Sequence, residues 1–170
     1  MLLDIAKQQL RKAGWYEGRK IDLSKYEEAY AKIGCEMFPA ARKFLEEFGD
    51  LKICDKIEFP YIKEGVSYNE SSTQWPICVG RRDLELEKRV DELYGQKILR
   101  VGALEYCEIY IYISEDGRFF VNWYFDGLWA ENSDQLWNEY YGEEYGRASW
   151  EDLKAGKGRT MFKKKAEKYL

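Results

Sequence analysis

Apolar residues recur at spacings of three and four in three stretches near the start of the chain, which is the period of an amphipathic helix. These stretches cover residues 2–13, 24–33 and 39–48. Ser24 with Glu27 predicts a capping box at the second helix. Each stretch is followed by a glycine, and we expect Gly49 to form a left-handed cap after the third. Three short helices are therefore predicted before any strand.

From residue 51 the pattern changes to short runs that are typical of strands. We expect strands over 51–54, 56–62 and 73–79, with the polar residues 63–72 between them as a loop. Leu86, Val90 and Leu93 then indicate another helix, which Gly95 ends. The strongest strand signals follow in residues 98–106, 108–114 and 118–125.

The last two of these runs predict an antiparallel hairpin that is apolar on both faces. Ile111 and Ile113 alternate with Tyr110 and Tyr112, and a turn at residues 115–117 connects the runs. Such a sheet should have helices over one face and a partly covered second face. The order of elements predicts an α+β domain whose central, mainly antiparallel sheet is flanked by helices.

The C-terminal part should return to helices. Ser133 and Ser149 are candidate caps, and Phe162, Ala166 and Tyr169 form one stripe in the tail. The length of 170 residues favours a single core. We therefore divide the chain into one domain over residues 1–150 and a basic, helical extension over residues 151–170, packed on the domain or trailing it.

Composition excludes several kinds of chemistry. The chain has no histidine, which removes Ser-His and Cys-His pairs, imidazole acid–base catalysis and histidine-bound metals. The four cysteines lie far apart without a C-x-x-C pair, so the spacing of zinc and redox motifs is missing. We expect reduced, mostly buried thiols, and neither a metal nor a cofactor.

The charge distribution bears on partners and location. A net charge of −4 and a pI near 5.2 argue against direct nucleic-acid binding, which needs clustered basic residues. No run approaches the roughly 20 apolar residues of a membrane span, and the charged N-terminus is unlike a signal peptide. We expect a cytoplasmic protein without membrane contact. Charge is also segregated, because residues 131–152 are strongly acidic and residues 154–170 strongly basic.

Paired carboxylates could indicate glycoside hydrolysis, and the abundant aromatic rings a sugar-binding platform. The pairs are Glu46 with Glu47, Glu85 with Glu87, and Glu143 with Glu144. Solvated helix or loop positions explain the carboxylates better, since no spacing in the sequence fixes their separation. Core packing likewise explains most of the rings. We expect no catalytic residues.

The segment "WNEYYGEEYG", residues 137–146, is the better candidate for a site. Tyrosine and tryptophan supply large contact areas, and carboxylates beside them attract a basic partner. Packing of a helix end is an equally good interpretation of the same pattern. As partner-binding residues we predict Trp137, Glu139, Tyr140, Tyr141, Glu143, Glu144 and Tyr145.

Four stretches in this order resemble the third immunity-protein group of the SUKH superfamily. They are "AGWYEGRKID", "FPAARKFLEEFGDL", "ELYGQKILRVGAL" and "IYIYISEDGRFF", and the resemblance covers about residues 8–145. The group is similar in fold to the cell-wall-synthesis regulator domains and is associated with bacterial polymorphic toxin systems. The resemblance implies a protein that binds a cognate toxin domain in the cytosol and blocks it without catalysis. A nuclease, with a basic substrate groove, is a candidate toxin.

The resemblance also gives the first stretch a structural interpretation. Gly14 and Trp15 should end the first helix and bury the indole beneath it, while Gly18 and Arg19 turn the chain toward the second helix. Arg19 is expected to pair with a nearby carboxylate. Two other functions stay open: a non-catalytic scaffold of the cell-wall-regulator type, and a carbohydrate-active or carbohydrate-binding protein.

The extension after about Ser149 departs from the family pattern. It could support a homodimer, pack on the sheet or contact a second partner.

Overall fold

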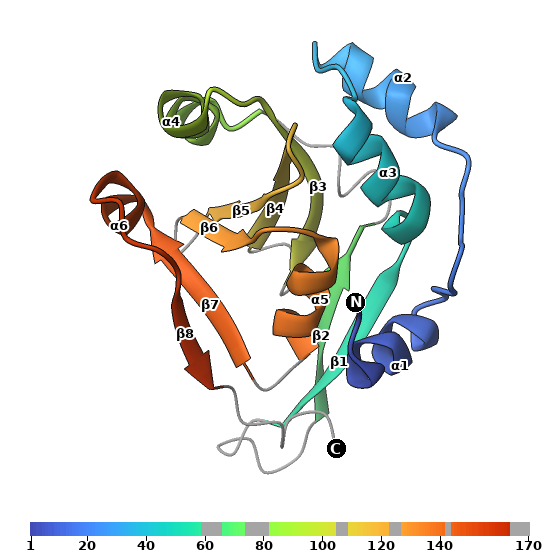
Figure 1. Cartoon of the computed structure of the whole chain (residues 1–170). Coiled ribbons are helices and arrows are strands. Elements are labelled where there is room, and N and C mark those ends of the chain that lie inside the picture. The colour runs from blue at the N-terminus through green and yellow to red at the C-terminus, as the bar shows by residue number, and fades with distance from the viewer. Residues whose placement is uncertain (59–65, 74–81, 105–108, 123–126, 142–143, 164–170) are drawn as a thin grey trace.

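A computed structural model describes residues 1–58, 66–73, 82–104, 109–122, 127–141 and 144–163 (Figure 1). The helices in these ranges are α1 (Asp4–Lys12), α2 (Ser24–Lys32), α3 (Pro39–Phe48), α4 (Leu84–Tyr94), α5 (Ser133–Tyr141) and α6 (Trp150–Lys154). The strands are β1 (Lys52–Glu58), β2 (Val66–Ser72), β3 (Ile98–Leu104), β4 (Ile109–Ser114), β5 (Phe119–Asn122), β6 (Gly127–Ala130), β7 (Glu144–Ser149) and β8 (Thr160–Lys163).

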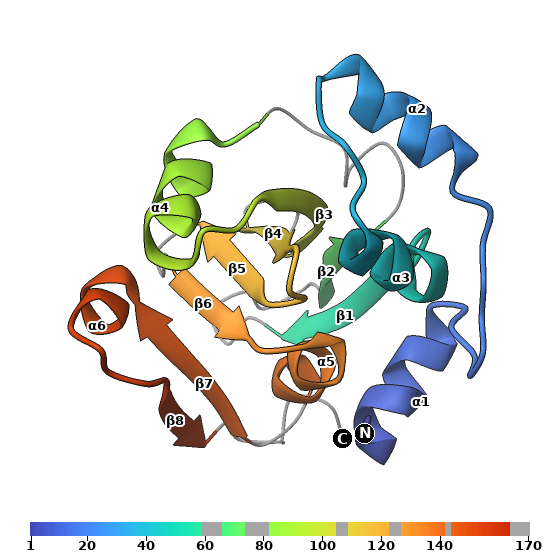
Figure 2. The same ribbon diagram turned by 45° about the horizontal axis from the view of Figure 1, so that its top comes forward.

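The described strands pair in the order of the chain, from β1 to β8, and each of these ladders is antiparallel. Consecutive pairing suits strands joined by short connections. Helices lie over both faces of the sheet, as Figures 1 and 2 show. The chain is thus a single α+β domain with an antiparallel sheet flanked by helices, as predicted.

The hairpin of β4 and β5 separates two hydrophobic clusters. Ile111 pairs with Val121 and faces the cluster under α1, α2, α3 and α5. Its neighbour Tyr112 pairs with Phe120 and faces the cluster under α4 and α6. This alternation is the one predicted, since successive side chains of a strand point to opposite faces. The second face, expected to be partly covered, is packed against α4 and α6.

Trp15 anchors the connection between α1 and α2. Its side chain is 4% exposed, and its ring stacks on Phe48 of α3 with centroids 6.2 Å apart. The indole N–H donates to Glu47 Oε1 at 3.3 Å. The predicted burial of Trp15 is confirmed.

Arg19 has a different partner from the one predicted. Its guanidinium donates to the backbone carbonyl oxygens of Glu47 and Gly49, at 2.9 and 2.7 Å. These carbonyls lie at the C-terminal end of α3, where a helix has unsatisfied acceptors. A cation is favourable there because it complements the helix dipole.

The end of α3 also corrects the assignment of Gly49 as a left-handed cap. Gly49 has φ −66°, and the left-handed residue is Asp50 with φ 56°. A Cβ on Gly49 would lie 2.4 Å from the carbonyl oxygen of Leu45. Glycine is therefore needed for a close approach of the backbone, and not for its dihedral freedom.

Other local predictions were wrong. Residues 66–72, predicted as a loop, form β2. Residues 160–163, predicted as part of a helical tail, form β8, which pairs with β7. At α2 the predicted capping box is replaced by Asp22, whose carboxylate accepts from Ser24 N at 3.0 Å. The predicted strand 73–79 lies outside the described residues except for Thr73, as do tail residues 164–170.

Candidate partner-binding site

The aromatic residues predicted as partner contacts lie inside the molecule. Trp137 and Tyr141 of α5 are each 1% exposed, and Tyr140 is 6% exposed. Trp137 packs against Phe44 and Phe48 of α3, with ring centroids 6.4 and 5.6 Å apart. The periodic spacing that places them together on α5 is the spacing of a buried helix face. These rings stabilise the core and are not surface anchors.

Glu139 is also buried, with 4% of its residue surface exposed. Its carboxylate forms an ion pair with Arg159, which precedes β8. Burial raises the pKa of Glu139, and Arg159 acts in the opposite direction. The residue therefore holds the C-terminal segment on α5 through Oε1, while its Oε2 atom is buried without a donor among the described residues.

The remaining predicted contacts follow α5. The backbones of Glu144 and Tyr145 are in β7 and pair with Lys163 and Phe162 of β8. Glu143 lies outside the described residues.

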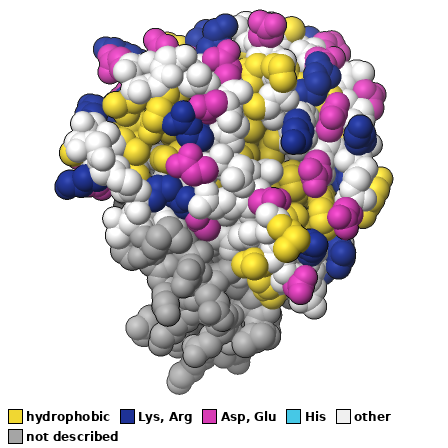
Figure 3. All heavy atoms as spheres, viewed as in Figure 1, with side chains coloured by type: hydrophobic (Ala, Val, Ile, Leu, Met, Phe, Trp, Pro, Cys, Tyr) yellow, Lys and Arg dark blue, Asp and Glu magenta, His cyan; other side chains and the backbone are white. Residues whose placement is uncertain are grey.

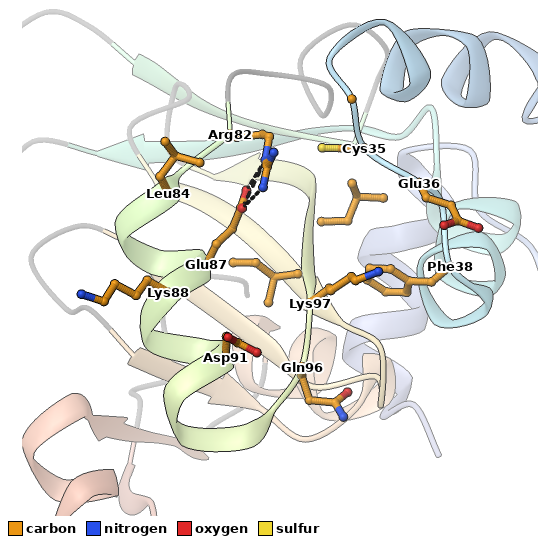
Figure 4. A pocket seen from close by; sticks show the side chains of 13 residues that line it. Cys35, Glu36, Phe38, Arg82, Leu84, Glu87, Lys88, Asp91, Gln96 and Lys97 are labelled. Carbon is orange, nitrogen blue, oxygen red and sulfur yellow. Dashed lines mark hydrogen bonds and ion pairs between the residues drawn. The ribbon is translucent and has the colours of Figure 1, made fainter.

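A cleft opens elsewhere, between the segment that follows α2 and the helix α4 (Figure 4). Its volume is about 610 Å³. Gly34, Cys35 and Glu36 line one wall, and Phe38 with the start of β3 forms the floor. Four residues of α4 line the other wall: Leu84, Glu87, Lys88 and Asp91. Their spacing of 0, 3, 4 and 7 positions is one continuous stripe of a helix.

The opposite face of α4 fixes this wall in place. Leu86 and Val90 are 3% and 0% exposed and pack on the second face of the sheet. Asp83 accepts from Leu86 N at 3.0 Å, which caps the helix, and from Asn122 Nδ2 at 2.5 Å, which ties the cap to β5. The cleft wall is therefore held by contacts that do not depend on a ligand.

The floor of the cleft is apolar. Phe38, Ile98 and Leu99 line it and are 9%, 7% and 3% exposed. A smaller cavity shares Ile98 and Leu99 with the cleft and reaches Tyr112. Burial, with a smaller contribution from Asp83, raises the pKa of Tyr112 to about 12. The phenol therefore stays neutral at physiological pH.

The cleft offers little catalytic chemistry. Burial raises the pKa of the Cys35 thiol, and the opposing effect of Arg82 is weaker. A thiol with a raised pKa is protonated at neutral pH and is a poor nucleophile. Arg82 and Glu87 form an ion pair at 2.5 Å. Within the described ranges, no His, Cys, Asp and Glu side chains are grouped so that they could hold a metal ion. The arrangement suits binding.

The sequence prediction missed this cleft, although part of its signal is visible. Leu86, Val90 and Leu93 identified the helix, but the second stripe beginning at Leu84 was not interpreted. A leucine on a mainly charged stripe marks an exposed apolar position, and Leu84 is 67% exposed. The opposite wall, from Gly34 to Phe38, lies far away in the sequence and gives no signal of its proximity.

The comparisons with known proteins identify the family. The profile of the SUKH-3 immunity protein family matches residues 4–141. The chain belongs to this family, and the prediction from the sequence is confirmed. The match spans α1 to α5 and includes both walls of the cleft. No curated protein and no solved structure matches significantly.

Family membership supports an immunity function and implies a cognate toxin partner. Among the described residues, no helix has the length and apolar character needed to cross a membrane.

Proposed function

We propose that this protein protects its cell by binding a cognate toxin domain in the cytoplasm and covering the surface that the toxin needs. The match of residues 4–141 to the SUKH-3 immunity protein family carries this proposal. Members of the family are generally non-catalytic. Burial raises the pKa of the Cys35 thiol, which agrees with inhibition by binding.

A nuclease is the toxin class that fits the charge of the chain. The net charge of −4 would attract a protein whose substrate groove is basic. Long-range attraction of this kind accelerates encounter and selects among partners. An immunity protein benefits from fast encounter, because the toxin acts from the moment it enters the cell.

Three of the sequence-predicted contacts remain in the proposed interface. Glu143, Glu144 and Tyr145 follow α5 in the chain, and we propose that they also contact the toxin. Trp137, Glu139, Tyr140 and Tyr141 are buried, so their part is to hold this region in shape.

The C-terminal extension is proposed to support a homodimer. β8 is the last strand in the sheet order, and its one described ladder is to β7. A terminal strand is a template for pairing with another chain. Light scattering over a range of protein concentrations tests this, and a mass of one chain at every concentration would contradict it.

Co-expression with the toxin domain encoded beside the gene tests the main proposal. We expect survival of the cells to be restored and the two proteins to co-purify when an inactive toxin variant is used. An unrelated toxin of different chemistry controls for general protection. Absence of both protection and binding, or formation of a product by the purified protein alone, would overturn the proposal.

A further inference from the structure

We propose that the cleft between residues 34–38 and α4 is where the toxin docks, and that it receives a toxin segment with an apolar side chain next to a lysine or arginine. This inference rests on the proposed function, because the occupant is a part of the toxin. It assigns a surface and a chemistry that membership of the family leaves open.

The apolar side chain of the proposed toxin segment is inferred from the exposed hydrophobic residues at the cleft. The large hydrophobic residues that are exposed within the described ranges are Met1, Leu3, Tyr16, Ile33 and Leu84. Leu84 lines the cleft, and Ile33 lines the smaller cavity that adjoins it. Together with the floor of Phe38, Ile98 and Leu99 they make an apolar centre with a charged rim. This is the anatomy of a protein interface.

Figure 3 shows hydrophobic side chains exposed on one face of the molecule, with acidic and basic side chains beside them. The cleft differs because its apolar residues lie in a hollow. A concave apolar surface can enclose an anchor side chain and exclude water from around it, which is the setting of binding hot spots.

The lysine or arginine of the proposed toxin segment is inferred from the carboxylates of the cleft walls. Glu36 lies on one wall, and Glu87 and Asp91 are four residues apart on the other. Glu87 is neutralised by Arg82. In the part of the chain that the structure describes, no ion pair joins Glu36 or Asp91 to a cation. Both carboxylates are therefore available to a cation from outside.

The lining contains three basic residues, Arg82, Lys88 and Lys97, against the three carboxylates. Lys88 pairs with Glu92 at 3.7 Å and points away from the cleft in Figure 4. Lys97 lines the cleft without an ion pair among the described residues. The carboxylates of Glu36 and Asp91 and the ammonium group of Lys97 are thus the cleft charges without an ion pair among the described residues. One incoming cation would balance them.

The C-terminal end of α4 strengthens the attraction for a cation. Its last turn contains no basic residue, although Asp91 lies close to the partial negative charge of the helix terminus. Lysine and arginine are normally favoured at this position because they complement the dipole. A toxin cation near Asp91 would supply the missing charge.

The volume of the cleft indicates how much of the proposed toxin interface it can form. A volume of about 610 Å³ is enough to enclose a small ligand or an anchor with its neighbours. A stable protein complex buries about 800 Å² on each partner. The cleft would therefore be the centre of a larger contact surface.

The test compares two cleft variants with two matched controls on the full chain. Leu84→Arg and Asp91→Lys alter the apolar part and the acidic part of the cleft. Leu3→Arg repeats the first change at another exposed leucine, and Glu85→Lys repeats the second on α4 outside the cleft. Each altered side chain is exposed, so the four variants should fold, which thermal unfolding verifies.

Binding is measured by calorimetry against an inactive variant of the toxin domain encoded beside the gene. We expect each cleft variant to weaken binding at least about tenfold and the controls to stay within about twofold. Asp91→Lys should also reduce the salt dependence of association.

The outcomes separate the two proposals. If the unaltered protein does not bind the toxin domain, the proposed function fails. If the unaltered protein binds and both cleft variants bind equally well, the function stands and the docking assignment is wrong. A change of oligomeric mass in the cleft variants with toxin binding intact would assign the cleft to a second copy of the chain, and would also overturn the inference.

Discussion

Glu139 and Arg159 form an ion pair inside the molecule, with 4% and 9% of their side chains exposed. Glu139 lies in α5, within the region that matches the family, and Arg159 lies beyond it. Arg159 also donates to the carbonyl oxygen of Gly146 in β7 at 3.0 Å. One guanidinium thus connects α5, β7 and the chain entering β8. The segment after the family match is tied to the domain through this contact.

Removing one member of the pair should be costly. Glu139→Gln or Arg159→Met leaves the other charge buried without its partner, and we expect a loss of about 3–5 kcal/mol in the free energy of unfolding. The double variant Glu139→Gln with Arg159→Met should lose less than the sum of the two. Denaturant unfolding of all four proteins gives the coupling energy. Additive losses would show that the pair contributes nothing as a pair.

The helices and the central hairpin could be predicted from the sequence because their burial and their periodicity agree. The α3 residues Ala41, Phe44, Leu45 and Phe48 repeat at helical spacing and are all buried. The alternation of Ile111 with Tyr112 likewise matches the two clusters of the sheet. Where the local pattern agrees with the tertiary environment, the pattern alone is enough to predict the helix or strand.

Strands β2 and β8 could not be predicted because pairing, and not composition, makes them strands. The segment VSYNESS is polar and reads as a loop, yet each of its seven residues is paired with β1. Residues 160–163 belong to an apparent helical stripe, but their ladder to β7 determines their conformation. Propensity is a weak prior for strands, which depend on their neighbours.

The candidate site was missed for a related reason. In the sequence, the aromatic and acidic residues of α5 have the pattern of a surface that binds a partner. The packing of α5 against α3 shows that they belong to the core. The cleft combines residues 34–38 with residues 82–99, and the described elements between them in the chain are α3, β1 and β2. No local sequence pattern predicts that these two segments face each other in the fold.

Trp15 and Tyr16 offer a matched pair of aromatic substitutions. Trp15 is 4% exposed and Tyr16 is 59% exposed. Trp15→Ala removes the stack on Phe48 and leaves a cavity, so it should cost about 3–5 kcal/mol. Tyr16→Ala should change stability by no more than about 0.5 kcal/mol. Denaturant unfolding measures both, and a Trp15→Ala loss below about 1 kcal/mol would contradict the anchoring role.

The hydroxyl of Tyr26 should stabilise the left-handed residue Asp50. It donates to Asp50 Oδ1 at 2.7 Å and accepts from Asp50 N at 3.0 Å. Tyr26→Phe keeps the buried ring but leaves these groups without the hydroxyl, at a cost of about 1–3 kcal/mol. Thermal unfolding measures the loss. The Asp50 N–H also donates to the carbonyl oxygen of Thr73 at 3.2 Å, so its hydrogen exchange should accelerate only in part. Unchanged stability of the variant would show that the hydroxyl does not hold this turn.

The carboxylate of Asp116 gives the fold a contribution that depends on pH. Partial burial acts to raise its pKa, but hydrogen bonds from Ser114 and Arg118 outweigh burial and hold the pKa below the ordinary value of 3.8. The Ser114 hydroxyl donates at 2.6 Å and Arg118 Nε at 2.9 Å. The folded chain therefore binds this proton less readily than the unfolded chain.

The sign of the effect follows from that difference. Stability from Asp116 is fully present above pH 3.8 and is lost as the pH falls toward the lowered folded-state pKa. Asp116→Asn should lower stability by about 1 kcal/mol at pH 7, because the charged hydrogen bonds are partly exposed, and should flatten the loss of stability in acid. Arg118→Gln removes the guanidinium, which donates to Asp116 Oδ2 through Nε and Nη2, and should raise the pKa of Asp116. Titration of the Asp116 carboxyl carbon by NMR measures this directly, and a midpoint at or above 3.8 in the unaltered protein would contradict the assignment.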